Sequence, residues 1–193
     1  AVTRMADRHP DLDAALETAL GALPAGSRIA REDATPMVTR ARSLKLPGEV
    51  ALLRYAARLS ESAVEAALAV AEPGVTEREL AAAIAGVMVA GGGDPRFVVA
   101  TTGERSALAD VLPTDRRWRP GETARFDVGC VVEGYWSDIG RTAVLGEPDD
   151  RQRQVWAAVY AGEQAQLELA RPGVTAAALF RAGLDATGAG VPA

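Results

Sequence analysis

Histidine and cysteine are almost absent from this sequence. Its 193 residues include one histidine, His9, and one cysteine, Cys130. A single histidine excludes any site within this chain that needs two imidazoles, and any Ser-His-Asp triad built on another histidine. A single cysteine excludes an intramolecular disulfide and a cysteine-rich zinc site. This cysteine usage fits a reducing compartment, so we expect a cytoplasmic protein.

Long apolar runs and an excess of positive charge are missing as well. The apolar runs are only a few residues long, far short of the roughly 20 that cross a bilayer, so we expect no membrane partner. The net charge is −5 and no basic stripe is present, which argues against nucleic acid as a partner. With 48% hydrophobic and 24% charged residues, the composition is typical of a globular protein. A length of 193 residues is enough for one domain and part of a second.

The sequence divides into two segments, 1–46 and 47–193, and predicts far fewer helices and strands for the first than for the second. The first segment offers one short helix over 11–23 and one strand over 27–30, which is too little to bury a core. We therefore interpret 1–46 as the remnant of an N-terminal domain with its linker. Residues 47–193 then form a partial domain of their own.

Helices and strands follow one another in the second segment. Apolar residues from Leu52 to Val70 recur at helical spacing, and Thr76 with Glu79 predicts the capping box of a second helix. The elements expected next are, in order, a strand over 97–101, a long loop over 102–122, a hairpin over 124–145 and a third helix over 149–170.

A Pro-Gly-Val-Thr segment occurs twice. Glu72-Pro73-Gly74-Val75-Thr76 recurs 99 residues later as Arg171-Pro172-Gly173-Val174-Thr175, each time between a long helix and a second helix. Pro-Gly between alanine-rich helices is common, but Leu80 and Leu179 also occupy the same offset after the two copies. We favour two structural half-domains, of which only the first continues into a strand and a hairpin.

Two aspartates, Asp127 and Asp138, fall among apolar residues where the predicted hairpin should be most buried. Because they are similarly distant from its turn, we expect them nearly opposite each other on one face, with Cβ atoms roughly 5 Å apart. Two ionised carboxylates that close repel each other unless a proton or a cation is shared. Three ways of relieving this repulsion stay open. One acid could be protonated, Arg125 or Arg141 could pair with the acids, or the acids could bind metal ions held about 3.5–4 Å apart.

The sequence around these aspartates reads Phe126-Asp127-Val128-Gly129, then Gly134-Tyr135-Trp136-Ser137-Asp138-Ile139-Gly140-Arg141-Thr142. This pattern resembles the first metal-ligand segment of the pita-bread metallopeptidases, a family of methionine aminopeptidase, Xaa-Pro aminopeptidase, prolidase and creatinase. Upstream, Pro73-Gly74-Val75-Thr76-Glu77 and Pro120-Gly121-Glu122 are similar to the prolidase and creatinase branch. The resemblance covers residues 42–183.

The resemblance implies an α+β pita-bread fold with pseudo-twofold halves, the second of them incomplete, and a homodimer. It also implies two divalent metal ions (Mn, Co, Zn or Fe), with Asp127 on one ion and Asp138 bridging both. The family's remaining ligands, a histidine and two glutamates, lie downstream of the residues present here. We therefore expect this chain to be part of a longer protein.

Asp110 marks a departure from the family pattern. In the loop before the hairpin the family carries a histidine that contacts the substrate and helps to stabilise the reacting carbonyl, and that position here holds Asp110. An aspartate is negative at neutral pH, so the change removes electrostatic help that is typically worth a few kcal/mol. The alternatives are a loop register shifted by one residue, or a loop that tolerates the change.

Two functions from different classes follow. The first is an enzyme, a metal-dependent hydrolase similar to Xaa-Pro aminopeptidases and dipeptidases that cleaves near the N-terminus of small peptides. Asp127 and Asp138 would hold its metals and Asp110 would line the substrate side. The second is a non-catalytic pita-bread binding module, and a related alternative is creatinase-like hydrolysis of a non-peptide small molecule. Stoichiometric metal binding and a substrate panel discriminate these functions.

Overall fold

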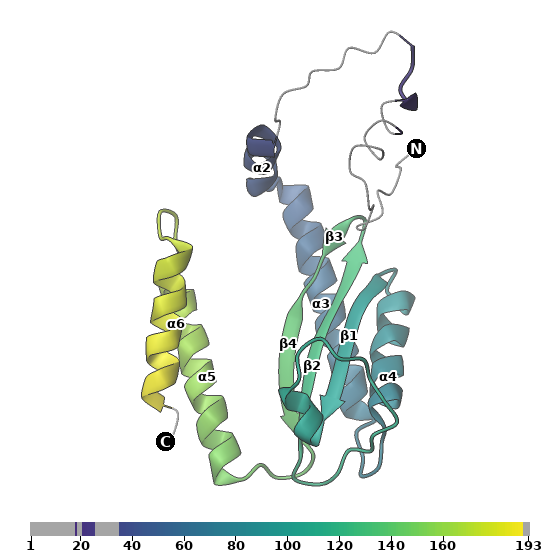
Figure 1. The fold of residues 1–193 in the computed structure, drawn as a ribbon, viewed down its shortest axis with the longest axis vertical. Helices are drawn as coiled ribbons and strands as arrows, with labels where there is room; N and C mark the ends of the chain where they lie inside the picture. The colour runs from purple at the N-terminus through teal and green to yellow at the C-terminus, as the bar shows by residue number, and fades with distance from the viewer. Residues whose placement is uncertain (1–17, 19–20, 26–34, 191–193) are drawn as a thin grey trace. The chain divides into compact units, whose positions relative to one another are not determined.

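The computed structural model describes residues 18, 21–25 and 35–190, which are coloured in Figure 1. The chain divides into two compact units, Ala1–Lys45 and Leu46–Ala193. His9, the predicted strand over 27–30 and most of the predicted helix over 11–23 lie outside the described residues. The interpretation of the first segment as a domain remnant stays a prediction. Within the described ranges, no helix has the length and apolar character to span a membrane.

The first unit contains a helix that the sequence analysis did not predict, α2 (Thr35–Ser43). Pro36 lies in its first turn, where a missing N–H is tolerated because that donor has no partner inside a helix. Arg40 and Arg42 lie in the last turn, where positive charge is favourable beside the carboxyl end of a helix. No residue of α2 is buried, so local interactions hold the helix and core packing contributes nothing.

In the second unit, helices α3 (Pro47–Ala69) and α4 (Glu77–Ala90) form where the apolar spacing predicts them. The predicted capping box of α4 is present. Thr76 Oγ1 accepts a hydrogen bond from the Glu79 N–H, and the Glu79 carboxylate accepts one from the Thr76 N–H. Gly91 ends α4, as predicted. The two helices pack against each other, α3 mainly against the strand β2 and α4 against β1 of the sheet described next.

An antiparallel sheet packs on this helix pair (Figure 1). Its strands are β1 (Asp94–Thr102), β2 (Thr123–Val132), β3 (Tyr135–Trp136) and β4 (Ile139–Val144). The central strand β2 pairs with β1 on one side and with β3 and β4 on the other. The second arm of the predicted hairpin is therefore interrupted between β3 and β4, at Ser137 and Asp138.

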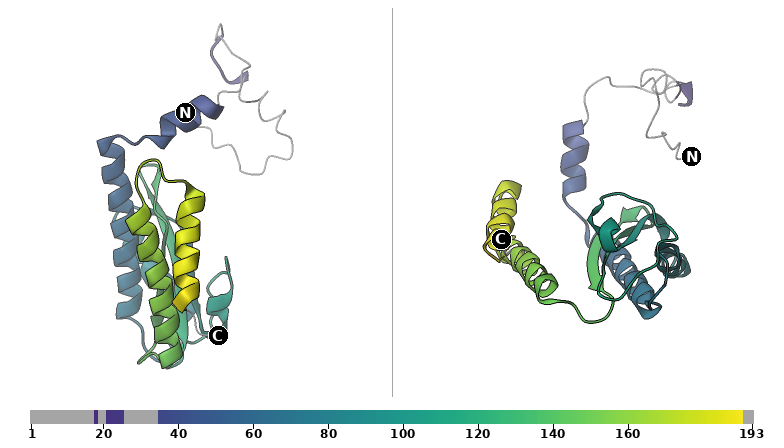
Figure 2. Two further views of the ribbon diagram at one scale, coloured as in Figure 1. Left: turned by 90° about the vertical axis from the view of Figure 1, so that its left-hand side faces the viewer. Right: turned by 60° about the horizontal axis from the view of Figure 1, so that its bottom comes forward.

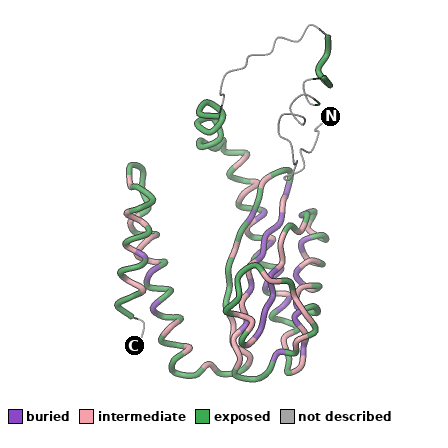
Figure 3. The backbone as a smooth tube through the Cα atoms, viewed as in Figure 1, coloured by how far each residue is buried: buried purple, intermediate pink, exposed green. Residues whose placement is uncertain are grey.

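Alternate residues of β2 point into the core. The even-numbered ones are all buried in one hydrophobic cluster with α3 and α4: Ala124, Phe126, Val128, Cys130 and Val132. The odd-numbered residues, Asp127 among them, lie on the opposite face of the sheet. Figure 3 shows the buried residues concentrated in α3, α4 and the sheet. The sheet thus has one face committed to the core and one face that carries polar side chains.

The long loop predicted between the first strand and the hairpin is present. It begins with a single 3₁₀ helix, η1 (Gly103–Ala107), which contacts both β1 and β2. Arg125 on the odd-numbered face of β2 donates a hydrogen bond to the Leu108 carbonyl. The start of the loop therefore lies over this polar face.

Helices α5 (Asp150–Leu169) and α6 (Ala176–Gly190) form a helical hairpin and lie side by side in Figure 2. Their backbones approach closely where glycine allows it. A Cβ atom on Gly162 would lie 2.1 Å from Thr187 Oγ1, and one on Gly183 would lie 2.3 Å from a side-chain nitrogen of α5. The pair repeats the helix–Pro-Gly–helix arrangement of α3 and α4, although no strand follows α6 in the part of the chain that is described.

Candidate metal centre

The register of the hairpin places the two predicted acids diagonally. β2 and β4 pair Asp127 with Gly140, and continuing this register puts Asp138 across from Gly129. The prediction that the acids lie nearly opposite each other is therefore wrong, because the turn falls at Glu133-Gly134 and offsets the pairing. Asp127 and Asp138 are diagonal neighbours on one face, a spacing of about 7–8 Å in an antiparallel pair.

The two acids are also less buried than the sequence predicts. The Asp127 side chain is 26% exposed and Asp138 is exposed. The neighbours expected to bury them, Phe126 and Val128, point to the other face of the sheet and into the core. Water therefore reaches both carboxylates, and their mutual repulsion is weaker than it would be in an apolar interior.

Arg125 is the cation that pairs with Asp127. Its Nη2 donates to Asp127 Oδ2 at 2.6 Å, and its Nη1 donates to the Leu108 carbonyl at 2.8 Å. The other candidate, Arg141, pairs with Glu61 of α3 at 2.8 Å. Of the three ways of relieving the repulsion between the acids, the structure thus shows pairing with arginine, at Asp127.

Ser137 fixes the backbone immediately before Asp138. Its hydroxyl lies 2.7 Å from Ser60 Oγ of α3 and accepts a hydrogen bond from the Cys130 N–H at 3.0 Å. The Ser137 N–H donates to the Cys130 carbonyl at 2.9 Å. Because both serines and Cys130 are buried, this polar cluster anchors the interruption between β3 and β4, and with it the position of Asp138.

Gly129, across from Asp138, has no room for a side chain. A Cβ atom there would lie 2.3 Å from the Ser137 carbonyl oxygen and 2.4 Å from Cε1 of the Phe97 ring. The glycine lets the ring and the Ser137–Asp138 segment approach β2 directly. The glycine of the Asp127-Val128-Gly129 motif is therefore required by the close packing beside the acids.

The structure brings all three predicted site residues into one groove. Asp110, Asp127 and Asp138 line a depression of about 770 Å³, together with mainly apolar residues of α4, β1 and the loop. Arg96 also lines it, but its charge is engaged by Asp94 at 2.7 Å. We call this depression the acid groove, because its three aspartates outweigh its one arginine.

Glu77 is a residue that the sequence analysis missed. Its fully buried carboxylate accepts hydrogen bonds from the Thr102 N–H at 2.9 Å and from the Thr114 N–H and hydroxyl at 2.9 and 2.7 Å. Arg105 Nε donates to both of its oxygens at 3.1 Å. One buried acid therefore joins α4, the end of β1, η1 and the loop. The available signal was its place on the buried stripe of α4, one turn before Leu80.

A second ion cluster fixes the two ends of the same loop. The Arg116 guanidinium donates to Glu104 at 2.6 Å, to Glu122 at 2.8 Å and to the Thr102 hydroxyl at 2.9 Å. The bond from Arg116 lowers the pKa of Glu104 to about 2 and also lowers the pKa of Glu122. The two glutamates in turn raise the pKa of Arg116 above its ordinary value. The loop is thus tied down at its start and its end by opposite charges.

The tip of the hairpin is tied to the start of α3. The Tyr135 hydroxyl donates to Glu49 Oε1 at 2.8 Å, and this hydrogen bond raises the pKa of Tyr135. Tyr135 supports the hairpin through this bond, and it does not line the acid groove.

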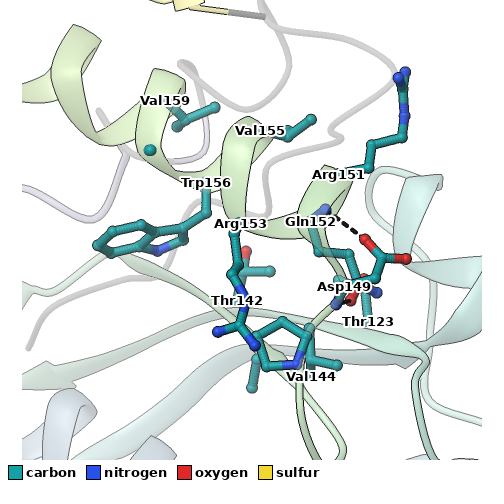
Figure 4. A pocket seen from close by; sticks show the side chains of 13 residues that line it. Thr123, Thr142, Val144, Asp149, Arg151, Gln152, Arg153, Val155, Trp156 and Val159 are labelled. Atoms are coloured by element: carbon teal, nitrogen blue, oxygen red, sulfur yellow. Dashed lines mark hydrogen bonds between the residues drawn. The ribbon is translucent and has the colours of Figure 1, made fainter. Parts of the chain in front are cut away.

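A different groove lies between β4 and the first turns of α5 (Figure 4). It encloses about 790 Å³, and its lining is mostly apolar, with Val144, Val155 and Trp156 among the residues drawn. Trp156 is 58% exposed and stacks on Tyr160 with ring centroids 5.1 Å apart. None of the three aspartates lines this groove, so the acid groove is the candidate site.

The acid groove fits a metal centre in the type of its donors but not in their number. Asp127 and Asp138 offer hard carboxylate oxygens, the ligands that magnesium and manganese favour. Across the described ranges, however, no group of three or more histidine, cysteine or acidic side chains is placed to hold a metal ion. The described residues therefore do not by themselves make up a complete metal site.

Residues 51–190 match the sequence profile of metallopeptidase family M24. The chain belongs to this family. Among its curated relatives, the Xaa-Pro dipeptidase of Pyrococcus furiosus is 34% identical over 137 residues, which are 70% of this chain and 39% of that protein. This M24 chain therefore spans well under half the length of that relative.

Solved structures agree with this assignment. The prolidase from Pyrococcus furiosus superposes with a TM-score of 0.76 and 30% identity, over 80% of this chain and 46% of that one. A substrate complex of Escherichia coli aminopeptidase P gives a TM-score of 0.78 with 27% identity, over 82% of this chain and 37% of that one. The predicted α+β pita-bread fold and the prolidase branch of M24 are confirmed.

Proposed function

We propose that the full-length protein cleaves small peptides near their N-terminus, as an Xaa-Pro dipeptidase or aminopeptidase that depends on two divalent metal ions. The observation that carries this proposal is the acid groove, in which Asp110, Asp127 and Asp138 meet on one face of the sheet. The relatives from Pyrococcus furiosus and Lactobacillus helveticus are named Xaa-Pro dipeptidases, which supports the substrate class. A cytoplasmic homodimer remains our expectation for the assembled protein.

In this proposal Asp127 and Asp138 hold the metal ions. Divalent ions in such a site supply an activated water and polarise a substrate carbonyl. The hydrogen bond from Arg125 engages Oδ2 of Asp127 and fixes the orientation of the carboxylate. Ser137 fixes the backbone at Asp138 through its buried partners. Carboxylate donors favour manganese among the ions considered above, so manganese is the first ion to test.

Asp110 acts on the substrate side of the groove. Its carboxylate attracts positive charge, and the free ammonium group at the N-terminus of a peptide is such a charge. The same property favours the second candidate function, creatinase-like hydrolysis of a cationic non-peptide molecule. A substrate panel of Xaa-Pro dipeptides and creatine-like amidines therefore separates the two activities.

The decisive variant is Asp138→Asn in the full-length protein. We expect the wild type to bind two manganese ions per chain and to hydrolyse Xaa-Pro dipeptides, and Asp138→Asn to lose both properties. Asp115→Asn is the matched control, because Asp115 pairs with Arg78 at an exposed position and does not line the acid groove. Metal content by elemental analysis and dipeptide hydrolysis are the two measurements.

Each outcome selects one function. Retention of two ions per chain by Asp138→Asn would falsify the metal-site assignment. Metal binding without hydrolysis of any peptide or amidine would identify a non-catalytic binding module. Hydrolysis of amidines alone would identify the creatinase-like activity.

A further inference from the structure

A single arginine interrupts the acidic lining of the acid groove. Arg96 is the one cationic side chain among the described residues that line it, together with Asp110, Asp127 and Asp138. Its ion pair with Asp94 at 2.7 Å neutralises it only in part, because the Asp94 side chain is 57% exposed and water weakens such pairs. The groove therefore presents positive charge at one place as well as negative charge at three.

A β-bulge directs Arg96 to this place. Pro95 of β1 pairs with Cys130, and Phe97 pairs with the next residue of β2, Gly129, so Arg96 is the extra residue between the two pairs. Extra residues of this kind change the direction of a side chain, and they are common beside active sites. In an unbroken ladder Arg96 would face Gly129, where the Phe97 ring packs instead. The bulge thus keeps the ring in the close-packed position and leaves Arg96 on the groove.

Trp136 of β3 and Asp94 hold the guanidinium of Arg96. Its Cζ lies 5.7 Å from the centroid of the Trp136 ring, which is the geometry of a cation–π contact. The contact with Asp94 is made by Nη2. A guanidinium offers five N–H donors in a planar fork that suits carboxylates, so donors remain for a second acceptor. Because the Arg96 side chain is 30% exposed, a small molecule in the groove can reach these donors.

We propose that Arg96 is a specificity-determining residue, which binds a carboxylate of the peptide substrate. A small peptide carries an ammonium group at one end and a carboxylate at the other. Asp110 suits the first charge and Arg96 suits the second, since arginine forms strong charge-assisted hydrogen bonds with carboxylates. The groove volume of about 770 Å³ lies in the ordinary range of sites for small molecules. This inference rests on the proposed function and adds a group that the substrate must carry.

The carboxylate of a peptide has two sources, the C-terminus and the side chain of an acidic residue. Two pairs of substrates for the full-length protein separate them. Ala-Pro and Ala-Pro amide differ only in the C-terminal charge, and Glu-Pro amide and Gln-Pro amide differ only in the side-chain charge. In the wild type, the charged member of one pair should have a KM about tenfold lower than its neutral partner, the effect of one charge-assisted hydrogen bond.

Arg96→Ala should abolish this difference in KM and leave kcat for the neutral peptide unchanged. Arg96→Lys keeps the charge but not the planar fork, so it should keep part of the difference. Asp94→Asn removes the carboxylate that competes for Arg96. It should therefore lower the KM of the charged peptide several-fold and leave that of the neutral peptide unchanged, a gain that a merely structural role of Arg96 does not produce.

Arg78→Ala is the matched control, because Arg78 also forms a partly exposed ion pair, with Asp115, but does not line the acid groove. It should keep the difference in KM of the wild type. If the wild type hydrolyses the peptides and Arg96→Ala discriminates them as the wild type does, or neither pair is discriminated, the role of Arg96 is wrong and the proposed function stands.

If none of the peptides is hydrolysed, the proposed function is wrong, and calorimetric titration of the same peptides into wild type and Arg96→Ala decides on Arg96 by itself. Tighter binding of a charged peptide than of its neutral partner, lost in Arg96→Ala, supports the carboxylate site. Equal binding of both members, or a difference that persists in Arg96→Ala, overturns it.

Discussion

Replacement of Glu77 by alanine should be among the most destabilising single changes in this chain. Glu77 is fully buried, and its carboxylate is the common acceptor for donors from β1, η1 and the loop. Alanine removes that acceptor and leaves the N–H groups of Thr102 and Thr114 without a partner. It also leaves the Arg105 guanidinium without its counter-ion.

The size of the effect follows from these contacts. Removing one partner of a buried ion pair costs about 3–5 kcal/mol. Arg105 is 25% exposed and recovers some hydration, so the lower end of that range, about 3 kcal/mol, applies here. Domains of this kind are stable by about 5–15 kcal/mol, so the variant loses a large share of its stability. Glu77→Gln keeps one oxygen acceptor and the shape of the side chain, so its cost should lie between those of the wild type and Glu77→Ala.

Urea unfolding measures this difference. With slopes of about 1–3 kcal/mol per molar urea, a loss of 3 kcal/mol lowers the midpoint by about 1–3 M. Glu79→Ala is the matched control, because Glu79 lies in the same first turn of α4 but its capping bonds to Thr76 are exposed to water. Its cost should be about 1 kcal/mol or less. The assignment of Glu77 as the main anchor of the loop is refuted if Glu77→Ala costs no more than Glu79→Ala.

Two further predictions test the packing beside the acids and the charges that bind the loop. Gly129→Ala should destabilise the protein by about 1–3 kcal/mol in urea unfolding, because its Cβ has no room. Gly140→Ala, with its nearest neighbour at 4.0 Å, should cost much less, and equal costs would contradict the packing argument. Glu104 has its pKa lowered to about 2 by Arg116, so its stabilising effect is present above the ordinary carboxyl pKa near 4.5 and is lost as the pH falls toward 2. Glu104→Gln should therefore be less stable than the wild type at pH 7, and the difference should shrink as the pH falls from 4.5 toward 2; a difference that stays the same size in acid would refute the assignment.

The helices and most of the strands could be predicted because their signals are local. Apolar residues at helical spacing mark α3, and the Thr76–Glu79 capping box marks the start of α4. The same Pro-Gly-Val-Thr segment marks the turn within each helix pair. Each of these signals is complete within a few neighbouring residues, so no knowledge of the folded chain is needed to interpret it.

The relative placement of the acids could not be predicted as reliably. That Asp127 and Asp138 share a face follows from the alternation of a strand, whereas their exact pairing depends on where the turn falls. A turn centred at Glu133-Gly134 makes them diagonal neighbours where direct opposites were expected. The exposure of both acids was also missed, because apolar neighbours in sequence alternate between the two faces of a sheet.

The anchors of the loop were beyond prediction from sequence. Glu77 bonds to Thr102, Arg105 and Thr114, which are separated from it by 25 to 37 positions and follow no period. Arg125 was considered as a partner for Asp127, but its bond to the Leu108 carbonyl has no counterpart in the sequence pattern. Contacts of this kind become visible only once the chain is folded.

The glycine contacts between α5 and α6 have a consequence for the order in which the chain folds. The two helices are adjacent in sequence and meet through Gly162 and Gly183, so the hairpin needs no distant segment to form. Contacts between neighbours in sequence form faster than contacts between distant segments, such as that of Ser60 in α3 with Ser137, which are 77 positions apart. The helical hairpin should therefore be complete early, with Trp156 and Phe180 facing water as they do in the folded structure. Exposed apolar side chains of this kind favour aggregation while the rest of the chain folds.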